Sequence, residues 1–152
     1  MAIEVLLVED SPGDARLLEE AFHMANKLIN IHVACDGVEA MSFLQHKGVY
    51  ANSPRPDIIM LDLNLPNMDG REVLSRIKED YSLKMIPVFV LTTSDAEADI
   101  ITSYQNRANC YHTKPMQWDA FQSLVKSIHD FWLTKVRLPQ QEHRDEHAVE
   151  SR

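Results

Sequence analysis

Three short apolar runs limit the folds open to this chain more than any other feature. Residues 5–8, 58–61 and 88–91 each consist of four consecutive apolar side chains. Such unbroken runs are typical of strands in a parallel sheet that helices cover on both faces. Residues 29–33 alternate between apolar and polar side chains, as in a half-buried edge strand, and residues 110–113 indicate a weaker edge strand. The sequence therefore predicts a five-stranded parallel sheet.

Helix signals lie between these strands. Three helix starts are readable, namely Ser11 followed by Pro12, and the pairs Asp36 with Glu39 and Ser94 with Glu97, which have capping-box spacing. Apolar residues at positions 73, 74 and 77 mark another helix, and the last is expected from about residue 117 to 136. Five strand–helix units predict a doubly wound α/β domain. The flavodoxin-like strand order 2-1-3-4-5 places the two less apolar strands at the edges.

The predicted domain covers residues 1–137. Residues 138–152 contain a proline, few apolar side chains and no periodicity, so we expect a disordered polar tail. Residues 143–147 of this tail (HRDEH) have the spacing of a metalloprotease motif. A zinc site needs a packed helix and a third ligand, so we interpret the match as chance.

The charge balance excludes several classes of partner. The 152 residues carry 15 Lys+Arg and 23 Asp+Glu, a formal net charge of −8. Nonspecific nucleic-acid binding needs the opposite charge. No apolar run reaches the roughly 18 residues of a membrane span, and the N-terminus lacks the basic region of a signal peptide. Cys35 and Cys110 are too few for a disulfide framework. We expect a cytoplasmic protein with neither nucleic acid nor membrane as a partner.

Acidic residues follow two of the predicted strands. Glu9 and Asp10 come directly after the first strand, and Asp62 follows the third. In this strand order the winding direction reverses between these two strands, and ligands bind at that point. Three carboxylates at close range repel one another unless a cation neutralises them. Hard oxygen ligands in this number predict a Mg²⁺ site.

A hydroxyl and an ammonium group are predicted at the same edge of the sheet. Thr92 ends the fourth strand, and Lys114 follows the fifth strand. The hydroxyl can hydrogen-bond an anion, and the lysine supplies a positive point charge. Together with a carboxylate and a divalent cation, these groups suit phosphoryl transfer to a carboxylate.

Four motifs resemble those of the receiver domain of two-component response regulators. They are residues 5–11, 62–70, 90–93 and 114–115, and the resemblance extends from about residue 3 to residue 137. It implies a single-domain receiver that takes a phosphoryl group from a sensor histidine kinase. Its output would be a protein contact or onward phosphotransfer, and it would be no enzyme beyond its own phosphorylation and dephosphorylation.

The resemblance also implies roles for individual residues. Asp62 would be the phosphoacceptor. Asp10, Asp62 and the backbone carbonyl of Asn64 would hold Mg²⁺, and Glu9 would act mostly through metal-bound water.

The remaining motif residues would contact the phosphoryl group or respond to it. By the same resemblance, Thr92 and Lys114 would bind the phosphoryl group. Tyr111 would change rotamer as the threonine moves toward the phosphate. The family usually has a small residue after this threonine, and Thr93 departs mildly from that pattern.

A narrower resemblance concerns the partner. Residues 86–94, 103–104, 108–111 and 131–133 are similar to the small stand-alone regulators of cyanobacterial phytochrome histidine kinases. This resemblance implies a phytochrome-type kinase and a role in light signalling.

Two other functions use the same residues. An aspartyl-phosphate phosphatase or phosphotransferase would share the nucleophile, but it typically has a second aspartate two residues later, where Asn64 stands. A degenerate receiver would act only as a constitutive binding module, and the complete set of motif residues argues against it. An EF-hand reading of residues 62–73 fails because Pro66 and Val73 occupy ligand positions.

The last predicted helix is apolar on more than one side. Phe121, Val125, Ile128 and Trp132 form a stripe that can face the sheet, whereas Leu124, Phe131 and Leu133 lie off it. Either the core stripe is wide, or part of the helix joins the fifth strand in a dimer or partner surface. For the second explanation we expect an interface of Phe121, Leu124, Phe131 and Leu133.

Overall fold

The structure, a computed structural model, describes residues 2–139 and alternates strands with helices. Its elements are β1 (Ile3–Val8), α1 (Pro12–Ala25), β2 (Ile29–Ala34), α2 (Gly37–Leu44), the short 3₁₀ helix η1 (Gly48–Tyr50), β3 (Ile58–Leu61), α3 (Gly70–Glu79), β4 (Val88–Thr92), α4 (Glu97–Gln105), β5 (Cys110–Thr113) and α5 (Trp118–Trp132). Most of the predicted tail, including residues 143–147, lies outside the described residues.

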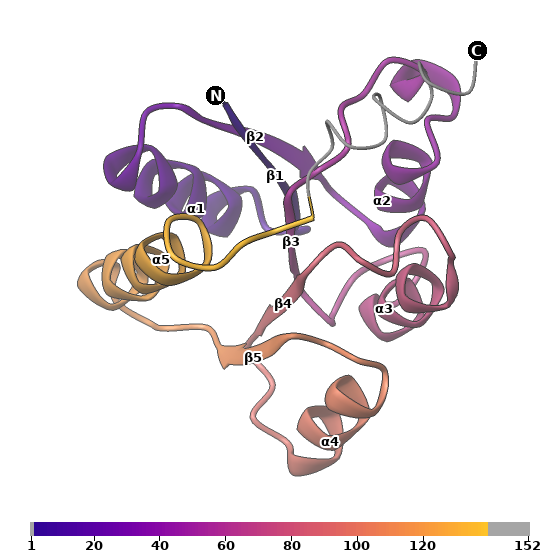
Figure 1. Cartoon of the computed structure of the whole chain (residues 1–152). Helices are drawn as coiled ribbons and strands as arrows, with labels where there is room; N and C mark the ends of the chain where they lie inside the picture. The colour runs from indigo at the N-terminus through magenta and orange to yellow at the C-terminus, as the bar shows by residue number, and fades with distance from the viewer. Residues whose placement is uncertain (1, 140–152) are drawn as a thin grey trace.

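All five strands form one parallel sheet in the order β2-β1-β3-β4-β5, so the predicted topology is confirmed. Helices α1 and α5 cover one face, and α2 and α3 cover the other, while α4 contacts β5 (Figure 1). Within residues 2–139, no helix is both long enough and apolar enough to cross a membrane. Cys35 and Cys110 are both free.

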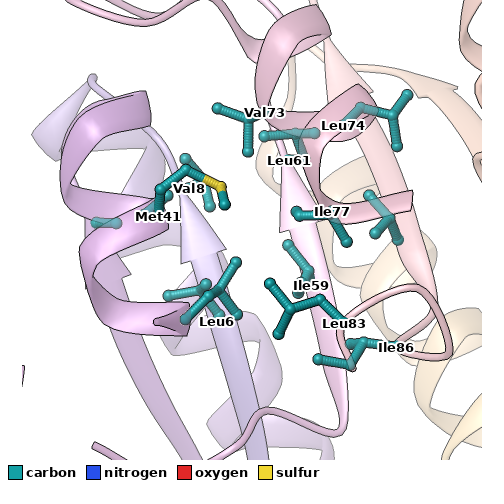
Figure 2. Packing of buried hydrophobic residues seen from close by; sticks show 14 of the residues in the cluster. Leu6, Val8, Met41, Ile59, Leu61, Val73, Leu74, Ile77, Leu83 and Ile86 are labelled. Carbon is teal, nitrogen blue, oxygen red and sulfur yellow. The ribbon is translucent and has the colours of Figure 1, made fainter. Parts of the chain in front are cut away.

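The central strands are apolar at every position because both of their faces are covered. Leu6 and Val8 point toward α2 and α3, together with Ile59 and Leu61 of the neighbouring strand (Figure 2). The intervening residues of the same strands, such as Leu7, join a second cluster under α1 and α5. Burial on alternate sides therefore accounts for the unbroken apolar runs.

The observed helix starts confirm two predictions and correct one. Ser11 caps α1 by accepting a hydrogen bond from the Asp14 N–H at 3.3 Å, and Asp36 caps α2. The capping box at Ser94 was wrong, since α4 is preceded by Ala96. Asp69 is the N-cap of α3.

The Ser94 hydroxyl makes other contacts than those of a capping box. Ser94 Oγ donates to Asp99 Oδ2 at 2.6 Å. The guanidinium of Arg71 holds that carboxylate in place with two hydrogen bonds, at 2.9 and 2.8 Å. Ser94 Oγ also accepts a hydrogen bond from the Ala96 N–H at 3.3 Å, so it stabilises the turn before α4 and does not cap the helix.

The last helix is shorter than predicted and mostly faces the core. It ends at Trp132, and Phe121 is buried in the cluster under α1 and α5, so its assignment to an interface was wrong. Leu124 and Leu133 are partly buried against the same cluster, whereas Phe131 is 55% exposed. The wide-stripe explanation therefore accounts for every one of these residues except Phe131.

The chain after β3 passes so close to α3 that only glycine fits at position 70. A Cβ atom there would lie 2.2 Å from the Asp62 carbonyl oxygen and 2.5 Å from the Leu63 Cα. Both atoms belong to the backbone, which cannot yield as a flexible side chain can. This contact holds the residues after Asp62 against the start of α3.

We predict that Gly70→Ala lowers the free energy of unfolding by about 1–3 kcal/mol, the usual cost of overpacking. The matched control is Gly13→Ala, because the nearest atom to a Cβ at that helical position is Ser11 Oγ at 3.9 Å. The control is expected to keep or slightly raise stability. Chemical denaturation measures both variants, and equal stabilities would contradict the packing argument.

Lys78 is a buried lysine that ties α3 to the segment before β4. Its Nζ donates to the carbonyl oxygens of Lys84 and Ile86 at 3.0 and 2.8 Å and to Asn109 Oδ1 at 3.3 Å. Burial lowers the pKa of Lys78 to about 8. Between pH 8 and its ordinary pKa, the unfolded chain therefore holds a proton that the folded protein has lost, so stability rises with pH.

We predict that wild type gains stability relative to Lys78→Met as the pH rises from 8 to 10.5. The gain is roughly 3 kcal/mol at most, from the size of the pKa shift. Urea denaturation of both proteins across this range measures the difference, in which contributions from other lysines and tyrosines cancel. A difference that does not change with pH would show that Lys78 keeps its proton when folded.

Candidate functional site

Three carboxylates converge at the carboxyl ends of β1 and β3, as predicted. Oxygen atoms of Glu9, Asp10 and Asp62 all lie within 4.8 Å of one another. Glu9 is 2% exposed and Asp62 is 6% exposed, whereas Asp10 faces solvent. We call this cluster of carboxylates, which is open to solvent at Asp10, the acidic pocket.

Sheet hydrogen bonds fix the backbone that carries these carboxylates. Val8 of β1 pairs with Leu61 of β3, so Glu9 and Asp62, the residues that follow them, lie side by side at the edge of the sheet. The Asp62 N–H donates to the Val8 carbonyl and the Glu9 N–H to the Ala34 carbonyl, both at 3.0 Å. The parallel register thus brings together residues that are far apart in the chain.

Lys114 extends into this pocket from the end of β5. Its backbone N–H donates to the Thr92 carbonyl at 2.7 Å, which anchors the lysine to β4. Its Nζ lies 2.5 Å from Glu9 Oε1 and 3.0 Å from Asp62 Oδ2, and its side chain is only 6% exposed. The ammonium group therefore lies against the predicted phosphoacceptor, as the sequence led us to expect.

Asp14 is a fourth carboxylate at the site, and sequence reasoning missed it. Its Oδ2 lies 3.0 Å from the Nζ of Lys114. In the sequence, Asp14 has the features of an ordinary acidic residue in the first turn of a helix, where the helix dipole favours it. Only the fold, which packs the start of α1 beside the end of β5, distinguishes it from such residues.

Burial and charge affect the two central groups in different ways. Burial raises the pKa of Glu9 to about 7, although its contacts with Lys114 and the Ser11 N–H act in the opposite direction. Burial alone would lower the pKa of Lys114, but the hydrogen bonds to Glu9, Asp62 and Asp14 outweigh it, and the pKa is raised. Lys114 thus stays charged while Glu9 is poorly stabilised as an anion.

Asn64 contacts both Asp62 and Thr92. Thr92 is fully buried, and its Oγ1 lies 3.5 Å from the Asn64 Nδ2. The Asn64 N–H donates to Asp62 Oδ1 at 3.1 Å, which helps to orient the carboxylate. The role of the Asn64 carbonyl as a metal ligand stays a prediction.

Tyr111 connects β5 to the loop that follows Thr92. Its hydroxyl donates to the Ser94 carbonyl at 2.8 Å, and its ring packs against the core cluster under α2 and α3. Since Ser94 also contacts Asp99, any movement of this loop changes the surroundings of both Tyr111 and α4. This arrangement suits a residue that responds to events at Thr92.

The donor set determines which ligands fit the pocket. Carboxylate oxygens are the ligands of hard divalent cations, and such an ion offsets the mutual repulsion of Glu9, Asp10 and Asp62. A carboxylate beside an ammonium and a hydroxyl is suited to accept and hold a phosphoryl group. The geometry thus fits both a divalent metal ion and phosphoryl transfer to Asp62.

Known proteins carry the same pattern. Residues 5–126 match the family described as "Response regulator receiver domain". The chain is 50% identical over 135 residues to the response regulator Rcp1 of Synechocystis, which covers 89% of this chain and 92% of that protein.

Solved structures agree with this match. The crystal structure of the phosphorylated cyanobacterial phytochrome response regulator RcpA has a TM-score of 0.89 and 46% identity, over 92% of this chain and 100% of that one. The Mn²⁺-bound form of Rcp1 has a TM-score of 0.86 and 48% identity, over 91% and 99% of the two chains. With the fold, the acidic pocket and these similarities in agreement, the chain belongs to the receiver-domain family of response regulators.

Proposed function

We propose that Asp62 accepts a phosphoryl group from a phosphohistidine of a sensor histidine kinase. The observation that carries this proposal is the buried Asp62 carboxylate, which lies 3.0 Å from the Lys114 ammonium and beside two further acids. A carboxylate oxygen of Asp62 forms the new bond to phosphorus, while the bond from phosphorus to the histidine nitrogen breaks. Such a reaction depends mainly on positioning and charge neutralisation, which this pocket supplies.

Mg²⁺ is the metal ion that we propose for the site. Asp10, Asp62 and the Asn64 carbonyl would hold it, with Glu9 acting mostly through metal-bound water. When bound, the ion neutralises the charge that builds up on the phosphoryl oxygens. The exposure of Asp10 supports this assignment, because an ion can enter from that side without disturbing the buried acids.

Thr92 and Lys114 would bind the phosphoryl group once it is attached. The Thr92 hydroxyl donates a hydrogen bond, and the Lys114 ammonium supplies a charge-assisted one. Movement of Thr92 would then alter the loop that carries Ser94, and with it the hydrogen bond from the Tyr111 hydroxyl. The result is a population shift in the face formed by α4, β5 and α5, which a protein partner can detect.

The names of the relatives support a narrower assignment. Rcp1 and the phytochrome response regulator RcpA are similar to this chain over most of their length. We therefore propose a phytochrome-type kinase as the phosphoryl donor and the cytoplasm as the location. The net charge of −8 supports a protein partner rather than nucleic acid or an anionic membrane. The chain would act only on its own phosphoryl group, and Asn64 occupies the position where an aspartyl-phosphate phosphatase has its second aspartate.

We predict that wild type forms a phosphoryl adduct with acetyl phosphate and Mg²⁺ and that Asp62→Asn does not. The amide cannot form the acyl phosphate, although it preserves the shape of the side chain. Intact-mass spectrometry detects the adduct. The matched control is Asp119→Asn, which removes an exposed aspartate from the first turn of α5 and is expected to label like wild type. Undiminished labelling of Asp62→Asn would rule out the proposal.

A second prediction concerns the metal. Asp10→Asn removes one of the proposed ligands, so we expect Mg²⁺ to bind at least about tenfold more weakly, equivalent to about 1.4 kcal/mol. The same change is expected to preserve or raise stability in EDTA, because it relieves repulsion within the carboxylate trio. Calorimetric titration measures the affinity, with Asp119→Asn again as control. Wild-type affinity in Asp10→Asn would show that Asp10 is not a ligand.

A second copy of this chain is the partner that we propose for the exposed part of α5. Phe131 is 55% exposed and packs edge-to-face on Trp132, with 5.9 Å between ring centroids. An exposed aromatic ring held in place by its neighbour is a favourable anchor for an interface.

Sedimentation tests this dimer with and without beryllofluoride, which mimics the phosphoryl group. We expect a dimer whose dissociation constant rises at least about tenfold in Phe131→Ala, as for an interface hot spot. Val49→Ala is the control, because Val49 is 93% exposed and lies far along the chain, in η1. A strict monomer under both conditions would contradict the dimer.

A further inference from the structure

The three carboxylates around Lys114 differ in their relation to the metal site. Glu9 and Asp62 belong to the trio whose oxygens lie within 4.8 Å of one another. Asp14 stands outside that trio but lies as close to the ammonium as Asp62 does, at 3.0 Å. Among the three carboxylates that contact Lys114, Asp14 is therefore the one that does not belong to the metal site.

The backbone of Asp14 is held firmly at the start of α1. Its N–H donates to Ser11 Oγ at 3.3 Å, while the next N–H, that of Ala15, donates to the Ser11 carbonyl at 3.0 Å. The side chain is 35% exposed, compared with 2% for Glu9 and 6% for Asp62. Asp14 is thus the most solvent-exposed of the three carboxylates that contact Lys114.

A cation in the pocket changes the balance of these contacts. The cation attracts the carboxylate oxygens of Glu9 and Asp62, and this weakens the attraction of the same oxygens for the Lys114 ammonium. Lys114 carries four rotatable methylene groups and about 2 kcal/mol of rotamer entropy, so an ammonium that loses its partners becomes free to move. A displacement of about 1 Å in a positioning group can slow a reaction by a factor of about 100.

We propose that Asp14 is a positioning residue, which keeps the Lys114 ammonium directed at Asp62 when a cation and a phosphoryl group occupy the pocket. The inference rests on the proposed phosphoacceptor role of Asp62. Asp14 acts only through Lys114 and touches neither the cation nor the phosphoryl group. It therefore affects the rate of phosphoryl acceptance and leaves the affinity for the cation almost unchanged.

The test compares Asp14→Asn, which is neutral and of the same shape, with Asp14→Glu, which keeps the charge. With acetyl phosphate at saturating Mg²⁺, we expect Asp14→Asn to be labelled at least about tenfold more slowly, as for the loss of one charge-assisted hydrogen bond. Its Mg²⁺ dissociation constant is expected to stay within about twofold of wild type, because Asp14 does not bind the cation. A twofold change corresponds to only about 0.4 kcal/mol. Asp14→Glu recovers part of the rate. Asp119→Asn, the same substitution in the first turn of α5, leaves both quantities unchanged.

Three results with the Asp14 variants would overturn the inference while leaving the proposed function intact. Labelling of Asp14→Asn at the wild-type rate would show that Lys114 needs no such support. A parallel loss of Mg²⁺ affinity would make Asp14 a metal ligand instead. Equal slowing in Asp14→Asn and Asp14→Glu, accompanied by lower thermal stability, would indicate a purely structural role. If wild type itself is not labelled, the proposed function fails and the inference fails with it.

Discussion

The contact between the Lys114 ammonium and the buried carboxylates of Glu9 and Asp62 is the interaction on which the rest of the site depends. It joins the ends of β1, β3 and β5, which no local stretch of sequence could bring together. Two buried acids of like charge would be costly without it. The same acids are also suitable ligands for a divalent cation.

The strand order makes this arrangement a consequence of the fold. Parallel strands end at the same edge, and the order β2-β1-β3-β4-β5 places the reversal of winding between β1 and β3. Val8 pairs with Leu61 and Thr92 pairs with Thr113, so the residues that follow these strands lie next to one another along the same edge of the sheet. Gly70 is also required, because any larger residue at the start of α3 would clash with the Asp62 carbonyl oxygen.

The sequence predicts the sheet and most of the site because both follow from unbroken apolar runs and from the polar residues directly after them. It fails where a side chain has a partner distant in the chain. Ser94 has the spacing of a cap, but its hydroxyl contacts Asp99 and the Ala96 N–H in the turn before α4. Asp14 resembles any acid in a first helical turn, but it contacts Lys114. Phe121 was assigned to an interface because helical periodicity alone cannot separate a wide core stripe from a surface.

The most direct measurement of the central claim is chemical identification of the residue that carries the phosphoryl group. Borohydride reduces an acyl phosphate to an alcohol, so a phosphorylated aspartate becomes homoserine, which peptide sequencing by mass spectrometry locates. Treatment of the protein after incubation with a sensor histidine kinase and ATP is predicted to give homoserine at position 62. Homoserine at another aspartate, such as Asp10 or Asp57, or at no aspartate, would contradict the account.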